Sequence, residues 1–230
     1  MLRAREDRHY YATDIQRDVL VDLIRNRIVT DIFFLTGGTA LSVFYLHHRQ
    51  SNDLDFFTLE EADLAELDFI LKTTYQHDYV RIKDAPNFLS ALIRDVKVDF
   101  VIDRLSLREE RERYALDVHH FLRLDTPRNI VSNKLCAVAS RIEPKDYVDL
   151  YALLASSQFT SFEQVFEDAR KKDAIFDDPP TAAYQIEQGL EFLRHHPQTF
   201  PPLLKPIDQQ DFARFYDRLT RWLYDRAMKE

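Results

Sequence analysis

The chain has little glycine and little cysteine. It contains three glycines and one cysteine in 230 residues, whereas average usage of about 7% predicts roughly sixteen glycines. The single cysteine, Cys136, excludes an intramolecular disulfide and a zinc site built from cysteines. Two of the three glycines are nevertheless adjacent, at Gly37 and Gly38. Because glycine is so rare in this sequence, the adjacent pair requires a local structural explanation.

Long apolar runs and a basic excess are also lacking. No apolar stretch approaches the roughly 20 residues that span a bilayer, and no apolar run for a signal peptide follows the polar N-terminal residues. We therefore expect a cytoplasmic protein without membrane contacts. The net charge of −8 argues against general binding to phosphate backbones, so any RNA contact requires a local patch.

Hydrophobic periodicity divides the chain into a mixed half and a helical half. We predict an α+β fold, with a mixed sheet and flanking helices over residues 1–125 and a helical domain over residues 126–230. The expected strands are 32–35, 53–58, 79–83, 88–94 and 96–102. The expected helices are 14–27, 39–48, 60–74, 127–141, 144–156, 161–172, 181–195 and 208–228. The best loop candidates are 177–180 and 196–206.

The glycine pair lies between an apolar strand and a helical run. A strand that enters a Gly-Gly turn and leaves into a helix gathers backbone N–H groups and the positive end of a helix dipole. Such a point binds anions, phosphate above all, and glycine allows the close approach. Thr39 can cap this helix and offer a hydroxyl. Taken alone, the pattern more often marks a structural turn than a binding site.

Two acids, Asp53 and Asp55, begin fifteen residues after Gly38. Residues two apart in a strand point to the same face, so both carboxylates project together while Leu54 and Phe56 face the core. Two acids aimed at one point repel each other unless a cation lies between them. Ligation by oxygen alone selects a hard ion such as Mg²⁺. A solvated edge or turn is the alternative for this pair considered by itself.

A third acid lies in the alternating run from Asp95 to Asp103. Its apolar positions form one face, while Lys97 and Asp99 lie on the other. An acid in the middle of such a strand is costly to bury without a partner. If this strand lies beside the one that carries Asp53 and Asp55, Asp99 completes a three-carboxylate site as a metal ligand or base. The alternative is a surface ion pair of Asp99 with a lysine or arginine.

These motifs resemble those of the AbiEii/AbiGii toxin family, a branch of the polymerase-β-like nucleotidyltransferases. The superfamily combines a Gly-Gly or Gly-Ser turn with D-x-D and a later single acid, and here these are Thr36–Leu41, Ser51–Phe56 and Asp99. Family members also carry a helical motif K…R-x-x-x-(K/R)-D-x-x-D-L. Its residues here are Lys134, Arg141, Lys145, Asp146, Asp149 and Leu150. The resemblance covers about residues 33–150 and implies that residues 1–125 form a polymerase-β-like nucleotidyltransferase domain.

The helical motif also has a physical interpretation. Lys134 and Arg141 lie two helical turns apart, share one face and could neutralise the charge of a triphosphate as it shifts to pyrophosphate. Asp146 and Asp149 share a face of the next helix and could orient these cations by ion pairing. The alternative is a salt-bridge network that binds no ligand.

Together the residues and the resemblance predict a metal-dependent nucleotidyltransferase that transfers a nucleoside monophosphate from an NTP to an acceptor hydroxyl. The resemblance implies the toxin of a type IV toxin–antitoxin or abortive-infection pair, a tRNA 3′ end as acceptor, and a cognate antitoxin as partner. The alternatives are a non-catalytic nucleotide-binding module and an enzyme that modifies an antibiotic or a protein. The predicted ligands of Mg²⁺ or Mn²⁺ are Asp53, Asp55 and Asp99. The predicted catalytic residues are these acids with Lys134 and Asp146, and the predicted nucleotide-binding residues are Gly37, Gly38, Thr39, Lys134 and Arg141.

Overall fold

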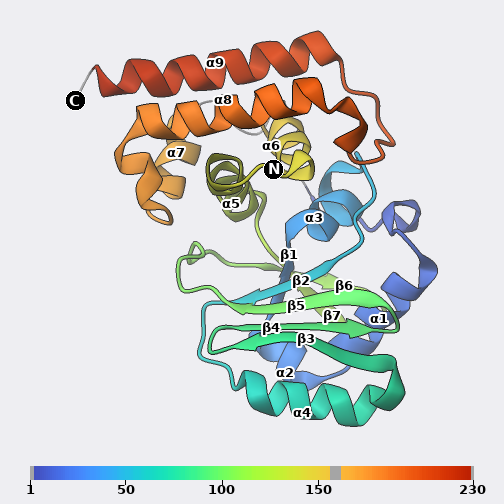
Figure 1. Ribbon diagram of the computed structural model, residues 1–230. Coiled ribbons are helices and arrows are strands. Elements are labelled where there is room, and N and C mark those ends of the chain that lie inside the picture. Colours follow the sequence, from blue (N-terminus) through green and yellow to red (C-terminus); the bar gives the residue numbers. More distant parts are fainter. Residues whose placement is uncertain (1–2, 156–161, 229–230) are drawn as a thin grey trace. The chain divides into compact units, whose positions relative to one another are not determined.

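The structure, a computed structural model, describes residues 3–155 and 162–228 (Figure 1). Residues 156 and 161, where two of the expected helices end and begin, lie outside the described residues. The chain forms two compact units, residues 3–126 and the residues from Pro127 onward. In the described part of the chain, no helix is both long enough and apolar enough to cross a membrane.

The first unit contains a seven-stranded mixed sheet with the order β3-β4-β5-β2-β1-β7-β6. Its strands are β1 (Phe34–Thr36), β2 (Leu54–Thr58), β3 (Tyr79–Ala85), β4 (Phe88–Ile93), β5 (Val96–Ile102), β6 (Glu112–Ala115) and β7 (Phe121–Leu124). Strand β2 runs parallel to β5, and β1 runs parallel to β7. The other neighbouring pairs are antiparallel.

Helices flank this sheet. They are α1 (Asp14–Ile24), α2 (Arg27–Ile32), α3 (Gly37–Thr39), a π-helical segment η2 (Ala40–Leu46) and α4 (Leu64–Tyr75), with short 3₁₀ turns η1 (Arg8–Tyr10) and η3 (Gln76–Asp78). Thr13 caps α1 by accepting a hydrogen bond from the backbone N–H of Gln16. The expected helix 14–27 divides in two because Asn26 accepts from the N–H of Ile28 and begins α2.

The core of the sheet unit is aromatic on one face of the sheet. Phe56 of β2 stacks on Phe100 of β5 with ring centroids 5.4 Å apart, and Phe33 meets Phe100 edge-on at 5.3 Å. All three side chains are buried, and each contributes about 1.5–3 kcal/mol through the hydrophobic effect. Helix α4 packs against β3 and β4 through Leu67 and Leu71.

Strands β6 and β7 are absent from the sequence prediction. In β6 only Tyr114 is partly buried, so the strand has no apolar alternation that a sequence pattern could detect. In β7 the buried residues are Leu122 and Leu124, too few for a clear pattern.

The second unit is helical. Its elements are α5 (Pro127–Ser140), α6 (Pro144–Ala155), α7 (Phe162–Arg170), η4 (Ala174–Asp177), α8 (Pro179–His195), η5 (Pro197–Thr199) and α9 (Gln209–Ala227). Helices α8 and α9 lie side by side (Figure 1). The expected loop 177–180 is wrong at its end, because Pro179 and Pro180 form the first turn of α8, where proline is tolerated.

The third glycine, Gly189, is explained by packing within this unit. The hydroxyl of Tyr147 donates to the carbonyl oxygen of Val138 at 3.1 Å, and it lies 1.8 Å from where a Cβ at position 189 would be. Any larger residue at 189 would therefore collide with Tyr147, whose ring is fully buried.

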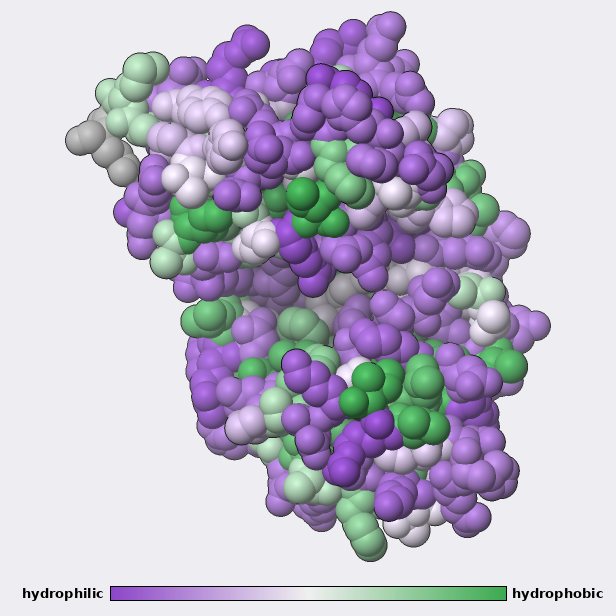
Figure 2. Space-filling view, viewed as in Figure 1, coloured by the Kyte–Doolittle hydropathy of each residue, from purple (hydrophilic) through white to green (hydrophobic). Residues whose placement is uncertain are grey.

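Hydrophilic residues cover most of the face drawn in Figure 2, with small hydrophobic patches between them. This agrees with a sequence in which 30% of the residues are charged. The large exposed hydrophobic side chains, such as Phe69, Val118 and Met228, are scattered along the chain, as is normal for protein surfaces.

Candidate active site

A row of polar side chains crosses the middle of the sheet. Ser90 of β4 is the register partner of Asp99, Asp99 is that of Asp55, and Asp55 is that of Thr36. Register partners point to the same face of a sheet, so the four side chains share one face. The expectation that the strand of Asp99 lies beside the strand of Asp53 and Asp55 is confirmed.

Asp99 is held by two neighbours. Its side chain is almost buried, and its Oδ1 accepts a hydrogen bond from the Ser90 hydroxyl at 2.5 Å. Its Oδ2 accepts from the Lys97 ammonium at 2.7 Å. These two bonds offset the cost of placing a carboxylate within an otherwise apolar strand.

Lys97 lies within the group of acids. If the β2–β5 register is extended by one residue before the Leu54–Val98 pair, Lys97 lies opposite Asp53. This position is two residues along the strands from the Asp55–Asp99 pair. Burial lowers the pKa of Lys97, but the hydrogen bond to Asp99 and the charges of Asp99, Asp53 and Asp55 raise it above its ordinary value. We call Asp53, Asp55, Asp99 and Lys97 the carboxylate cluster.

The Gly37-Gly38 turn lies against this cluster. Gly37 has a φ of +69°, and a Cβ on it would lie 2.2 Å from the Oδ2 atom of Asp55. A Cβ on Gly38 would lie 2.6 Å from both the Nη2 atom of Arg49 and the Oγ atom of Ser51. Both glycines therefore leave room for polar side chains that reach the turn, and Gly37 also adopts a backbone conformation that favours glycine.

Thr39 differs from its expected capping role. The residue at the N-cap of α3 is Thr36, and the side chain of Thr39 is fully buried. The Thr39 hydroxyl donates to the backbone oxygen of Asp53 at 2.5 Å, while the Gln16 amide donates to that of Ser51 at 2.9 Å. These bonds fasten the segment before β2 to the turn, so any contact of Thr39 with phosphate falls to its backbone N–H.

The predicted metal ligands have the donor atoms that a hard divalent cation prefers, but they do not form a complete metal site. Within residues 3–155 and 162–228, no three His, Cys, Asp or Glu side chains gather closely enough to hold a metal ion. The donors of the carboxylate cluster are nevertheless all oxygens, which suit Mg²⁺ or Mn²⁺. A cation, the Lys97 ammonium, already lies on Asp99. The metal-binding roles of Asp53, Asp55 and Asp99 stay a prediction.

The helical unit contains the second group of predicted residues. The Lys134 ammonium on α5 lies 2.6 Å from Asp146 Oδ1 and 2.8 Å from Asp149 Oδ2, both on α6. The Arg141 guanidinium lies 2.7 Å from Asp146 Oδ2. Both acids are fully buried, whereas 58% of the Arg141 side chain is exposed. The predicted ion pairing is confirmed, and the phosphate-binding role of the two cations stays a prediction.

Asp146 is the centre of this second group. Burial raises the pKa of its carboxyl, but the charges of Lys134 and Arg141 and their hydrogen bonds lower it below its ordinary value. Asp146 is therefore ionised at neutral pH and holds both cations in fixed positions.

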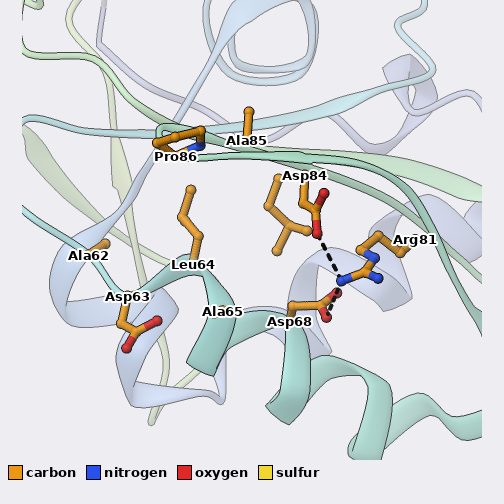
Figure 3. Close-up of a pocket in the computed structure, with 10 residues that line it drawn as sticks. Ala62, Asp63, Leu64, Ala65, Asp68, Arg81, Asp84, Ala85 and Pro86 are labelled. Atoms are coloured by element: carbon orange, nitrogen blue, oxygen red, sulfur yellow. Dashed lines mark hydrogen bonds and ion pairs between the residues drawn. The ribbon is translucent and has the colours of Figure 1, made fainter.

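A pocket of about 500 Å³ lies elsewhere on the sheet unit, between α4, the edge strand β3 and its neighbour β4 (Figure 3). Its Arg81 guanidinium pairs with Asp68 at 3.2 Å and with Asp84 at 2.9 Å. Leu89 lines the pocket, so the adjacent Ser90 points to the opposite face of the sheet. The pocket is thus separate from the carboxylate cluster.

Sequence reasoning missed the polar partners of the predicted residues. Lys97 shares the face of Asp99 through its spacing of two, which was a usable signal. Ser90 gave none, because only the register of β4 with β5 brings it to Asp99. Arg49 and Ser51 lie just before Asp53 in sequence, but their approach to Gly38 depends on the fold.

Comparison with known proteins identifies relatives of this chain. A protein of Aquifex aeolicus with no characterised function is 31% identical over 139 residues, which is 60% of this chain and 65% of that protein. The match thus covers less than two thirds of the relative's length.

Solved structures share the fold. JHP933 from Helicobacter pylori superposes with a TM-score of 0.51 and 18% identity, over 94% of this chain and 95% of that one. MenT4, a nucleotidyltransferase toxin from Mycobacterium tuberculosis, gives 0.51 and 13% identity over 92% and 83%. At this level of identity the likeness establishes the nucleotidyltransferase fold and nothing finer.

A match over most of the chain supplies the family assignment. Residues 18–228 match the family described as "Nucleotidyl transferase AbiEii toxin, Type IV TA system". This range includes the glycine turn, the carboxylate cluster and the Lys134 group. The chain therefore belongs to the AbiEii nucleotidyltransferase toxin family and is a nucleotidyltransferase.

Proposed function

We propose that this protein transfers a nucleoside monophosphate from an NTP to an acceptor hydroxyl and releases pyrophosphate. The observation that carries the proposal is the position of Asp55, which is the register partner of Asp99 and rests against Gly37. This position supports a site in which carboxylates bind a cation next to a glycine turn that binds phosphate, the two requirements of nucleotidyl transfer.

In this proposal the backbone N–H groups of Gly37 and Gly38 bind the phosphates of the NTP. Divalent cations held by Asp53, Asp55 and Asp99 would neutralise phosphate charge and acidify the attacking hydroxyl. Asp99 accepts the proton of that hydroxyl, and its bond from Ser90 fixes its orientation.

The proposal gives Lys134 and Arg141 the role of stabilising phosphate charge as the leaving pyrophosphate forms. The exposed guanidinium of Arg141 supports direct contact with an anion. Lys134 contributes its positive charge from a nearly buried position, and Asp146 orients both cations.

We further propose that the acceptor is an RNA, with the 3′ end of tRNA first among candidates, and that the protein is the toxin of a pair with an antitoxin. The family to which the chain belongs supports this role. The net charge of −8 means that the acceptor is bound through a local surface rather than through a general basic one.

The experiment is incubation of the purified protein with each labelled NTP, Mg²⁺ and total cellular RNA. We expect one NTP to label RNA of tRNA size, and Asp53→Ala to abolish the label. Asp84→Asn, in the separate pocket, is the matched control and should leave labelling unchanged. Absence of transfer from any NTP to RNA, protein or small molecules overturns the enzyme proposal, and label on another acceptor class overturns the RNA proposal alone.

A further inference from the structure

We infer that Lys97 is a built-in counter-cation of the carboxylate cluster, which pairs with Asp99 and competes with a divalent cation for that carboxylate. Lys97 thereby weakens metal binding and sets the metal concentration that the protein needs. The inference rests on the proposed function, because it assumes that Asp53, Asp55 and Asp99 bind the metal.

The contacts of Lys97 show direct competition for one atom. Its ammonium donates to Asp99 Oδ2 at 2.7 Å, while Ser90 donates to Oδ1 at 2.5 Å. Both oxygens of Asp99 thus accept a hydrogen bond. A cation that approaches Asp99 Oδ2 meets the positive charge of an ammonium 2.7 Å from that oxygen, so Lys97 opposes its binding.

The charges around Lys97 explain why it lies there. Asp53, Asp55 and Asp99 all act on its ammonium and favour its charged form. Carboxylates that share one face of neighbouring strands repel one another, and the Lys97 ammonium offsets part of this repulsion.

The exposure of the Lys97 side chain fits displacement. This side chain is 40% exposed, so its ammonium has space to turn toward water when another cation binds Asp99. Arg49, whose Nη2 atom reaches Gly38, is 3% exposed and donates to the backbone oxygen of Gln50. The two exposures thus leave more space for movement to Lys97 than to Arg49.

If the Lys97–Asp99 ion pair were permanent and purely structural, the Lys97→Gln variant would behave differently from the variant expected for a displaceable counter-cation. A structural pair would make the Lys97→Gln variant less stable at any metal concentration and would leave its metal affinity unchanged. The counter-cation makes the variant less stable only without metal, and raises its metal affinity, since the added cation then replaces the missing charge.

The test is Mn²⁺ binding to the full chain, measured by electron paramagnetic resonance of free Mn²⁺, together with thermal unfolding with and without Mn²⁺. We expect Lys97→Gln to bind Mn²⁺ about tenfold more tightly, because a positive charge within the cluster is removed. It should also show a larger rise in Tm on addition of Mn²⁺. Lys97→Arg should bind no more tightly than the unaltered protein, since a guanidinium keeps the charge and grips a carboxylate with two bonds.

Two controls separate this inference from the proposed function. Lys83→Gln removes an exposed positive charge from β3 of the same unit and should leave Mn²⁺ binding unchanged. Asp53→Asn should weaken binding. If Asp53→Asn weakens binding but Lys97→Gln binds like the unaltered protein or more weakly, the inference is wrong and the proposed metal site stands. If neither Asp53→Asn nor Lys97→Gln changes Mn²⁺ binding, both are wrong.

Discussion

Asp55 and Asp99 are directly opposite each other on the parallel neighbours β2 and β5. Adjacent strands lie about 4.8 Å apart, so two carboxylates are forced close together on one face of the sheet. Their surroundings differ, because Asp99 accepts hydrogen bonds from Ser90 and Lys97, while Asp55 rests against Gly37. This difference allows the two acids to be separated by experiment.

The first prediction compares Asp55→Asn with Asp99→Asn. Both should lower kcat for nucleotidyl transfer by at least about a hundredfold, because each removes a carboxylate from the proposed site. Asp99→Asn should also lower the free energy of unfolding by about 1–3 kcal/mol, because the charge-assisted bonds from Ser90 and Lys97 are lost, whereas Asp55→Asn leaves both of these bonds in place. Chemical denaturation without metal measures these free energies, and an unchanged stability of Asp99→Asn would contradict the assignment.

The second prediction concerns Gly37. Gly37→Ala should lower the free energy of unfolding by about 1–3 kcal/mol, because alanine is strained at a φ of +69° and its Cβ would displace the Asp55 carboxylate. Transfer activity should fall more than stability explains, since Asp55 moves. The measurement is kcat at a temperature where urea titration shows the variant fully folded. An unchanged kcat at that temperature would mean that the glycine turn is not part of the active site.

The alternating strand patterns predicted the centre of the sheet correctly because burial of one face imposes a period of two on β2 and β5. The sequence patterns could not supply the register that puts Asp55 opposite Asp99, because pairing between strands is set by tertiary packing. The sequence patterns also could not identify Ser90, because only the pairing of β4 with β5 brings it to Asp99.

Local hydrogen bonds explain the errors. Asn26 interrupts the expected helix 14–27 with a new cap, and Thr39 turns its hydroxyl to the Asp53 carbonyl instead of capping a helix. In both cases the hydrogen-bond partner is a group whose position depends on the folded chain. Residue types and spacing therefore indicated which side chains matter, and the fold determined which partners they have.

The third prediction concerns Gly189 in the helical unit. Gly189→Ala should lower the free energy of unfolding by about 1–3 kcal/mol through overpacking against the Tyr147 hydroxyl, 1.8 Å from the new Cβ. Tyr147→Phe in the same chain should recover only part of this loss, because the ring carbon Cζ would still lie 2.5 Å away. Thermal unfolding of the single and double variants tests this, and additive losses would show that the two residues are not coupled.

The fourth prediction contrasts Lys134 with Arg141. Lys134→Met leaves the buried carboxylates of Asp146 and Asp149 without their shared cation and should cost about 3–5 kcal/mol of stability. Arg141→Ala should cost at most about 1 kcal/mol, because its side chain is mostly exposed. If Arg141 binds phosphate as proposed, its variant should still lose kcat/KM for the NTP. A normal kcat/KM in Arg141→Ala would leave this group a purely structural network.

The fifth prediction concerns the pH dependence of stability through Asp146. Although burial raises the pKa of this carboxyl, Lys134 and Arg141 hold it below its ordinary value in the folded chain. A lowered pKa contributes stability above the unfolded value of about 3.9, and that contribution is lost as pH falls through the folded value. The difference in unfolding free energy between the unaltered protein and Asp146→Asn should therefore be constant from about pH 7 to 5 and shrink below about pH 4. Asp84→Asn, in an exposed ion pair with Arg81, is the control and should change stability by less than about 1 kcal/mol. A difference for Asp146→Asn that does not shrink in acid would mean that its charge does not stabilise the fold.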